Sequence, residues 1–308
     1  MKRLFRIVLL LTAGTVLARP GVAAAADRIK VVATFTVIGD MVRNVAGDLV
    51  DLVTIVGPDS DCEEYEPTAA DVPKLANSRI LFMNGLNDDF EPWLDNLMKQ
   101  AKFAGTKVIV SRGVKALTAE DEHPIGGKPK ATVLDQHAWM TPHNGIVYVR
   151  NIVDTLARID PANADTYRNR AASYTQQLRD LDSWAHDEMA AVPVAKRRVL
   201  SSHDSLQYLG VAFGITMISV NGWTNKSEPS AADLARLTDQ IRREHVRALF
   251  LDSITDPRAM ERISKETGAA IGGTVYGDAL SKPDGEAGTY VEMIRHDVST
   301  LKAGMLLN

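Results

Sequence analysis

Residues 161–189 read PANADTYRNRAASYTQQLRDLDSWAHDEM, a polar stretch in which apolar side chains recur at intervals of three and four. Asp160 and Pro161 form a favourable helix start, because proline suits an early helical position. The apolar residues fall into a single stripe, made of Tyr167, Ala171, Tyr174, Leu178 and Leu181. A helix of this length spans roughly 40 Å, enough to cross a whole protein of this size. The stretch therefore predicts a long backbone helix near the middle of the chain.

Short apolar segments alternate with helical segments on both sides of this helix. On the N-terminal side, strands are expected at residues 29–34, 52–56, 80–83 and 108–110, with helices at 38–46, 70–76 and 93–102 between them. On the C-terminal side, the expected strands are 198–200, 215–220, 248–251 and 270–275. The expected helices there are 206–213, 231–245 (capped by Ser230), one that begins after Asp256 and Pro257, and 289–305. Such alternation is typical of parallel sheets. We therefore expect two α/β lobes, each built on a parallel sheet, joined by the long helix.

The predicted division places a signal peptide at residues 1–26, the first lobe at 27–160, the linking helix at 161–190 and the second lobe at 191–308. Lys2, Arg3 and Arg6 precede an apolar core, and small residues at 22–26 offer a cleavage site. The apolar run is shorter than the roughly 20 residues that span a bilayer. Because no cysteine follows the leader, lipid attachment is not expected. These features predict a soluble periplasmic protein.

Composition narrows the class of function. The full chain carries a net charge of −4 and no basic block follows the leader, so nucleic-acid binding has little support. Cys62 is the only cysteine, which rules out an internal disulfide even in an oxidising compartment. The stability of the fold must therefore come from its core, and a monomer is expected.

Four polar segments each place a metal-binding side chain at the end of an expected strand or in the loop after it. They read DCEEYEP (61–67), DQHAW (135–139), SSHD (201–204) and YGDAL (276–280). Two imidazoles and at least two carboxylates form the donor set that borderline divalent transition metals prefer. Ligands so far apart in sequence can meet only in a folded cleft, and parallel sheets bind ligands beyond the carboxyl ends of their strands. The segments predict a site between the two lobes.

The same segments carry a family resemblance. YEPT (65–68), the Asp71-Val72 pair, DQHAW, SHD (202–204), EPS (228–230), GGTVYGDAL (272–280), GTY (288–290) and MIRH (293–296) resemble, in that order, the zinc/manganese solute-binding proteins of bacterial ABC importers. The resemblance covers essentially the whole chain after the leader. It implies two α/β lobes joined by one long helix, with a metal held between them, and no enzymatic activity. It also implies a membrane permease and its ATPase as partners.

By this resemblance, three ligands are His137, His203 and Asp278. The fourth position departs from the family, because Glu63 stands where a histidine is usual, and Glu64, Cys62 or a water molecule remain alternative donors there. Carboxylate oxygen is harder than imidazole nitrogen, which suits manganese or ferrous iron, but the general affinity order still favours zinc. We therefore expect the ligand set Glu63, His137, His203 and Asp278, with zinc as the preferred ion and manganese or ferrous iron next.

Other polar residues have less specific interpretations. Asp252 follows a strand and is expected either to orient His203 or a bound water, or to cap the next turn. Residues 65–67 (Tyr-Glu-Pro) are expected to shape the loop that carries Glu63. The acidic segment 117–133, which contains His123, is expected to be a mobile surface loop with weak metal capture at most. The remaining histidines lie on predicted helices or at their starts and are interpreted as surface or packing residues: His143, His186, His245 and His296.

Two alternatives to metal import remain at this point. An exported metallohydrolase would need an open coordination position and a general base near the bound water, for which Glu64 or Asp252 could serve. A metal chaperone or an adhesin-like surface protein would keep the binding site and change its use. Four protein ligands argue against the hydrolase, and the absence of a lipid-anchor cysteine argues against surface attachment.

Overall fold

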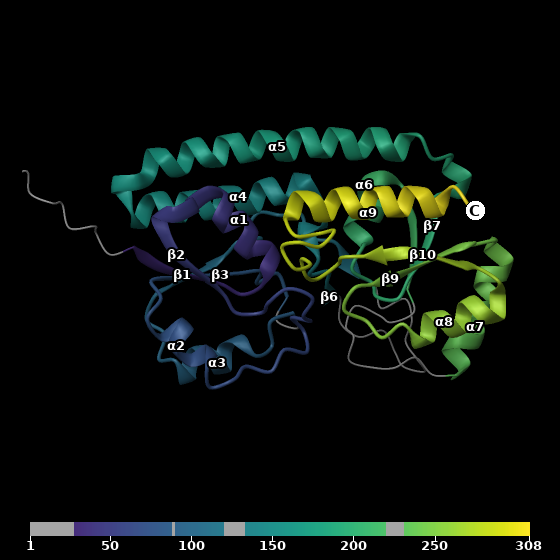
Figure 1. The fold of residues 1–308 in the computed structure, drawn as a ribbon, viewed down its shortest axis with the longest axis horizontal. Helices are drawn as coiled ribbons and strands as arrows, with labels where there is room; N and C mark the ends of the chain where they lie inside the picture. Colours follow the sequence, from purple (N-terminus) through teal and green to yellow (C-terminus); the bar gives the residue numbers. More distant parts are fainter. Residues whose placement is uncertain (1–27, 88–89, 120–132, 220–230) are drawn as a thin grey trace, which may run out of the picture.

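Two four-stranded parallel sheets lie side by side beneath one long helix (Figure 1). The computed structural model describes residues 28–87, 90–119, 133–219 and 231–308. Several sequence-based predictions lie outside these residues: the leader at 1–26, the acidic segment with His123, and residues 228–230, including the Ser230 cap. The predicted fold class, two parallel-sheet α/β lobes with a long helix between them, is confirmed.

The first lobe has the strand order β2-β1-β3-β4. Its strands are β1 (Ile29–Ala33), β2 (Val50–Thr54), β3 (Ile80–Met83) and β4 (Thr106–Ile109), and its connecting helices are α1 (Thr36–Ala46), α2 (Asp71–Ala76) and α3 (Leu94–Gln100). Every residue of β3 is buried. A continuous apolar run is what a central parallel strand needs when it is covered on both faces.

The second lobe repeats this plan with the order β10-β9-β7-β8. Its strands are β7 (Arg198–Ser201), β8 (Thr216–Ser219), β9 (Ala248–Asp252) and β10 (Ala270–Val275), and its helices are α6 (Gln207–Phe213), α7 (Ala231–Glu244), α8 (Arg258–Thr267) and α9 (Tyr290–Met305). Thr289 caps α9 by accepting a hydrogen bond from the backbone of Glu292, which is the geometry that threonine favours at a helix start.

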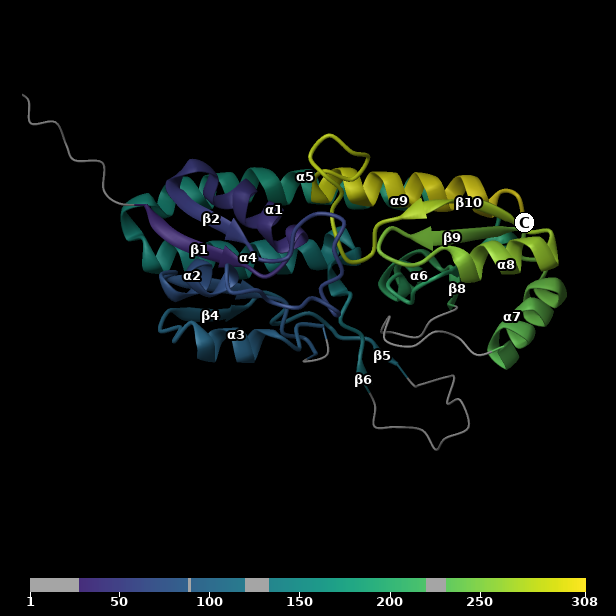
Figure 2. The same cartoon turned by 60° about the horizontal axis from the view of Figure 1, so that its bottom comes forward.

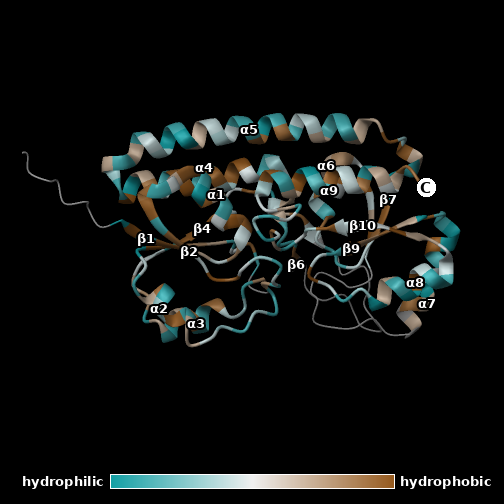
Figure 3. Cartoon of the chain, viewed as in Figure 1, coloured by the Kyte–Doolittle hydropathy of each residue, from teal (hydrophilic) through white to brown (hydrophobic). Residues whose placement is uncertain are grey.

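The long helix α5 (Ala164–Ala190) follows one 3₁₀ turn at Pro161–Asn163. Its buried side includes all five residues of the predicted stripe, so that prediction is confirmed. The helix packs against α1 and α4 of the first lobe and against α6 and α9 of the second. Its outward side is mostly hydrophilic, whereas the strands beneath are hydrophobic (Figure 3). α5 therefore gives both lobes a common support.

Two elements go beyond the sequence-based expectations. The 18-residue helix α4 (Pro142–Ile159) was anticipated only as a start near His143; its signal is Thr141, which caps the backbone N–H of Asn144, followed by a proline in the first turn. The ends of the expected loop at 117–133 pair as an antiparallel ribbon, β5 (Thr118–Ala119) with β6 (Val133–Leu134). This ribbon lies between the two lobes (Figure 2).

Hydrogen bonds join the lobes around this central region. The indole Nε1 of Trp139 donates to the carbonyl of Gly277 at 2.8 Å, and the hydroxyl of Tyr290 donates to the carbonyl of Trp139 at 2.5 Å. The backbone N–H of Leu280 donates to Thr36 Oγ1 at 2.9 Å. These bonds bring the carboxyl ends of the strands from both sheets to the same junction.

Candidate metal centre

The four predicted donors meet at this junction. Glu63 lies between β2 and α2, His137 follows β6, His203 follows β7 and Asp278 follows β10. One ligand atom from each lies within 4.8 Å of those from the other three. Glu63 is 2% exposed and the other three side chains are fully buried. Two elements of each lobe thus supply a single buried cluster of two imidazoles and two carboxylates.

Asp278 stands between the two histidines. Its Oδ1 lies 3.2 Å from His137 Nε2, and its Oδ2 lies 3.2 Å from His203 Nε2. Oε1 of Glu63 lies 3.8 Å from the same His137 nitrogen. The two imidazole rings meet nearly edge to face, with centroids 5.2 Å apart. Each carboxylate therefore faces at least one imidazole nitrogen.

The short contacts around Asp278 are ion-pair contacts with the two histidines, and their geometry is poor for hydrogen bonds. Among the residues that the structure describes, neither oxygen of Asp278 and neither ring nitrogen of His203 makes a hydrogen bond of acceptable geometry. Buried polar atoms are nearly always hydrogen-bonded, so such a group needs an explanation. Once the imidazoles lose their protons, the nitrogen and carboxylate lone pairs face into one small cluster, which is the arrangement that a metal cation requires. The donor set of two nitrogens and two carboxylates fits a divalent transition metal.

Asp135 supports the histidine of the first lobe. Its Oδ1 lies 2.8 Å from His137 Nδ1 and accepts a hydrogen bond from the His137 backbone N–H at 2.8 Å. A carboxylate on Nδ1 fixes the tautomer so that Nε2 can bind a metal. Trp139 and Phe90 pack against the imidazole edge to face, and these rings exclude water from that side.

The loop that carries Glu63 is held by its own polar groups. Oδ1 of Asp61 accepts a hydrogen bond from the backbone N–H of Glu63 at 2.7 Å, and Trp93 Nε1 donates to the carbonyl of Cys62 at 2.8 Å. Tyr65 packs edge to face on Trp93 and donates to Asp71, so the Tyr-Glu-Pro segment does shape this loop, as predicted. The amide Nε2 of Gln136 donates to Glu63 Oε1.

The alternative donors of this loop do not join the cluster. Glu64 is exposed, and the grouped donors in the described part of the chain include Glu63 but neither Glu64 nor Cys62. Cys62 is fully buried, and burial raises the pKa of its thiol well above the usual value, with Glu91 adding to the effect. A thiol kept protonated is a poor metal ligand.

Asp252 lies close to the second-lobe donors, but its carboxylate accepts hydrogen bonds from other residues. Its Oδ2 accepts a hydrogen bond from Ser205 Oγ at 2.9 Å, and its Oδ1 accepts one from the backbone N–H of Ile254, in the following turn, at 3.4 Å. Because neither ring nitrogen of His203 is hydrogen-bonded within the described residues, Asp252 does not orient this imidazole directly. Of the two predicted roles, the structure supports capping of the following turn.

Burial and the neighbouring charges shift the pKa values of the cluster residues. Burial, reinforced by Asp278, raises the pKa of Glu63 to about 8. Burial alone would raise the pKa of Asp278, but His137 and His203 hold it well below its usual range. Burial alone would lower the pKa of His203, yet Asp278 raises it to about 9. The cluster therefore holds protons in places where a divalent cation can replace them.

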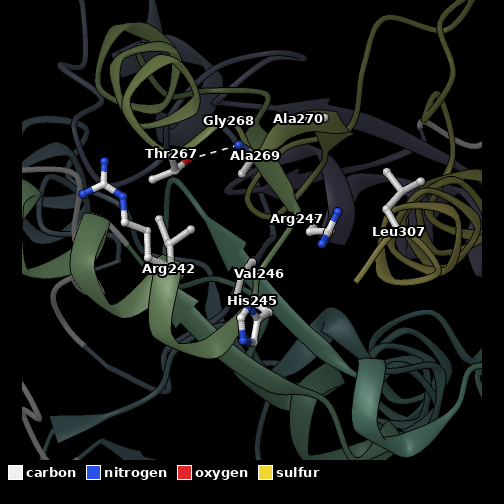
Figure 4. Close-up of a pocket in the computed structure, with 10 residues that line it drawn as sticks. Arg242, His245, Val246, Arg247, Thr267, Gly268, Ala269, Ala270 and Leu307 are labelled. Carbon is white, nitrogen blue, oxygen red and sulfur yellow. Dashed lines mark hydrogen bonds between the residues drawn. The ribbon is translucent and has the colours of Figure 1, made fainter.

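The other histidines do not belong to the cluster. Among the described residues only the four predicted donors form such a group. His186 packs on Phe213, and His296 lies beside Tyr276 with its Nε2 2.9 Å from the carbonyl of Thr274. His245 lines a hollow at the far end of the second lobe, between the ends of α7 and α8 (Figure 4). None of the four donors lines that hollow, and the donor cluster itself is buried.

Gln136 is the supporting residue that the sequence does not indicate. The position of Asp135, two residues before His137, predicts a hydrogen-bond partner for that imidazole, and the structure confirms the contact. Gln136 gave no signal, because its partner Glu63 lies 73 positions away. Within the described residues, no helix combines the length and the apolar character required to cross a membrane.

Comparison with known proteins identifies the class. Residues 31–304 match the family model described as the periplasmic zinc-uptake complex component A. The iron-binding protein YfeA of Yersinia pestis is 29% identical over 91% of this chain and 87% of its own length. The manganese ABC transporter substrate-binding lipoprotein PsaA of Streptococcus mitis is 29% identical over 92% and 91%, respectively.

A solved structure agrees with this assignment. The periplasmic zinc-binding protein TroA of Treponema pallidum superposes with a TM-score of 0.82 at 26% identity, covering 90% of this chain and 99% of that one. The family comprises substrate-binding components of transporters and not enzymes, which removes the metallohydrolase alternative. The chain belongs to the periplasmic zinc-uptake component A family, and it is the substrate-binding component of a metal ABC importer.

Proposed function

We propose that this protein binds its cargo, a single divalent transition metal, through Glu63, His137, His203 and Asp278, with zinc as the preferred ion. One observation carries the proposal: four buried donors from two lobes come within 4.8 Å of one another. The lobes are taken as residues 27–160 and 191–308, with 161–190 as the linking helix. Because each lobe supplies two donors, metal binding holds the lobes together.

The choice of zinc rests on the donors. Two imidazole nitrogens and two carboxylates form a four-donor set of the kind zinc occupies, and zinc exceeds manganese and ferrous iron in the general affinity order. The names of the three relatives point to iron, manganese and zinc in turn, so the relatives do not favour one ion. Manganese and ferrous iron are the second candidates, because a second carboxylate makes the donor set harder.

Metal analysis of purified protein tests the ligand set. The wild type is expected to carry one equivalent of zinc after exposure to a mixture of zinc, manganese and ferrous iron. Glu63→Ala should lose most of the affinity, and Glu63→His should retain zinc while discriminating more strongly against manganese. Glu64→Ala is the matched control, since Glu64 is the exposed neighbour and its removal should change nothing. A Glu63→Ala protein with full affinity would remove Glu63 from the ligand set, and a wild type that binds no metal would refute the proposal.

Delivery requires the lobes to separate. The lobes are tied by α5 and by hydrogen bonds such as that from Trp139 to Gly277. We propose that small tilts and loop shifts, rather than a wide hinge motion, open the cluster when the protein docks on a membrane permease with its ATPase. Loss of zinc that is accelerated by the reconstituted permease, and not by liposomes alone, would support this step. Equal rates with and without the permease would contradict it.

The location is proposed as the periplasm. The basic residues and apolar core of the leader favour export, and cleavage is expected before Asp27. Mass spectrometry of the protein recovered from the periplasm should find a mature chain that begins at Asp27 and carries no lipid, and gel filtration should find a monomer. A lipidated or membrane-retained product would contradict the proposed location.

A further inference from the structure

Gln136 joins the two first-lobe donors. It directly precedes His137 in sequence, its side chain is almost completely buried, and its Nε2 donates a hydrogen bond to Glu63 Oε1. The oxygen that accepts this bond is the same one that lies 3.8 Å from His137 Nε2. One amide thus holds the particular carboxylate oxygen that faces the metal cluster.

A carboxylate oxygen can accept a hydrogen bond and still bind a metal. It has two lone pairs, and the amide of Gln136 occupies one of them. The hydrogen bond also resists rotation of the carboxylate, so it selects Oε1 as the oxygen that is presented. The amide itself brings no net charge, so it acts on the geometry of the ligand and leaves the charge of the donor set unchanged.

Gln136 is itself firmly placed. Its backbone carbonyl accepts a hydrogen bond from Asn84 Nδ2 at 2.9 Å. Asn84 is fully buried, and its Oδ1 accepts from the hydroxyl of Tyr148 at 2.5 Å. The carbonyl of Asn84 accepts from Ser111 Oγ at 2.6 Å. A supporting residue that is fixed by its own hydrogen bonds can hold a ligand in one orientation.

We propose that Gln136 is a positioning residue for Glu63 and thereby sets the preference of the site among metals; this inference rests on the proposed function. By keeping Glu63 a one-oxygen ligand, Gln136 limits the site to a low coordination number, which suits zinc. Manganese favours sites with about six oxygen-rich ligands. When the amide is removed, the carboxylate can turn and offer both oxygens, so zinc loses its advantage.

The test is a double-mutant cycle read out with two metals. Gln136→Met keeps the length of the side chain and removes its donor, and it is made in the wild type and in Glu63→His. Zinc and manganese affinities are measured by competition with chelators, and the melting temperature of the metal-free protein reports folding. Gln240→Leu is the matched control, because the Gln240 amide donates to the Glu244 carboxylate at 3.0 Å on α7, far from the cluster. Gln136→Asn, which withdraws the amide by one methylene, replaces Gln136→Met if the latter does not fold.

In the wild-type background, Gln136→Met should weaken zinc binding by about 10- to 100-fold, the usual effect of losing such a support. Manganese binding should weaken less, so the zinc-to-manganese ratio falls. In Glu63→His the same change should alter zinc affinity by less than about twofold, because coupled residues lose their coupling when one is replaced. Gln240→Leu should leave both affinities unchanged.

Three results would overturn the inference: unchanged zinc affinity, an equal loss in both backgrounds, or an unchanged ratio between the two metals. The second would mean that Gln136 supports the fold and not Glu63. Failure of the proposed function itself is distinguishable, since the wild type would then bind neither metal. If the wild type binds metal tightly and Gln136→Met binds it equally well, the proposed metal site is supported and only the role of Gln136 is refuted.

Discussion

The two halves of the metal cluster are built differently. In the first lobe, hydrogen bonds hold both donors: Asp135 supports the ring of His137, and Gln136 supports Glu63. In the second lobe, neither ring nitrogen of His203 and neither oxygen of Asp278 has a hydrogen bond of acceptable geometry within the described residues. The difference suggests that the first-lobe half is organised before the metal arrives, whereas the second-lobe half is completed by the metal.

Removal of Asp278 should have the largest effect. It faces both histidines at 3.2 Å, so Asp278→Ala takes away a proposed ligand and the negative charge between two imidazoles. Zinc affinity should fall by more than about 100-fold, beyond the effect of losing a mere support. Isothermal titration or chelator competition measures the loss.

The control for this change is Asp284→Ala, which removes an exposed carboxylate in the loop that follows the site. It should bind zinc as the wild type does. If Asp278→Ala bound zinc nearly as tightly as the wild type, Asp278 would not be a ligand, and the metal would not complete the second-lobe half of the cluster.

Binding should also depend strongly on pH, because each half holds a proton that the metal must displace. Glu63 has a pKa of about 8 and His203 one of about 9 before metal binds. Both pKa values are raised above their usual values, so both groups are protonated at pH 7. A metal must displace these protons in order to bind. Affinity should therefore increase as the pH rises from 6 towards 9, by up to tenfold per pH unit for each proton released.

Titrations in buffers of different ionisation enthalpy count those protons. At pH 7 the wild type should release at least one proton, and Glu63→Ala should release fewer. A proton count of zero, or an affinity that does not change between pH 6 and 8, would mean that the cluster is already deprotonated and that the carboxylates are not in competition with protons.

The fold could be predicted from the sequence more completely than the site. The stripe from Tyr167 to Leu181 and the βα alternation on both sides are local patterns, and local patterns determine helices and strands. The donors at strand ends could also be found, because parallel sheets bring the carboxyl ends of their strands to one edge. Helix α4 was anticipated only at its start, although Thr141 and Pro142 carried the signal of an N-cap.

The supporting contacts could not be predicted in the same way. The bond between Gln136 and Glu63 joins residues 73 positions apart, and no periodicity encodes which side chain meets which across two loops. The position of Asp252 left two roles open, and only the bond from the backbone N–H of Ile254 to its carboxylate decided between them. The sequence thus indicates which residues can bind a metal, whereas the three-dimensional contacts determine how firmly each one is held.

The contrast between Asp135 and Asp252 tests the two halves directly. Asp135→Asn leaves the shape of the side chain but weakens the bond to His137 Nδ1, so zinc affinity should fall by about 10- to 100-fold. Asp252→Asn removes a carboxylate that makes no hydrogen bond to the ring of His203 within the described residues, so the change should stay within a few-fold. If both variants lost affinity equally while their melting temperatures matched the wild type, the second half would be as strongly supported as the first.

The smallest effect is expected from Tyr208→Phe. The Tyr208 hydroxyl, on α6 of the second lobe, donates to the backbone carbonyl of Asp135 at 3.1 Å and accepts from the N–H of Leu117 at 3.1 Å. It therefore connects the second lobe to the segment that carries His137. Loss of these bonds should cost about 1 kcal/mol of unfolding free energy and should change equilibrium zinc affinity only a few-fold.

The release rate of zinc should respond more than the equilibrium affinity does. The two bonds of Tyr208 join elements of different lobes and must break or stretch when the lobes separate, so their removal should speed metal loss to a chelator. Tyr65→Phe is the control, because its hydroxyl bonds to Asp71 within the first lobe. If Tyr65→Phe and Tyr208→Phe accelerated release equally, the effect would reflect general destabilisation, and the separation of the lobes would not be the step that limits release.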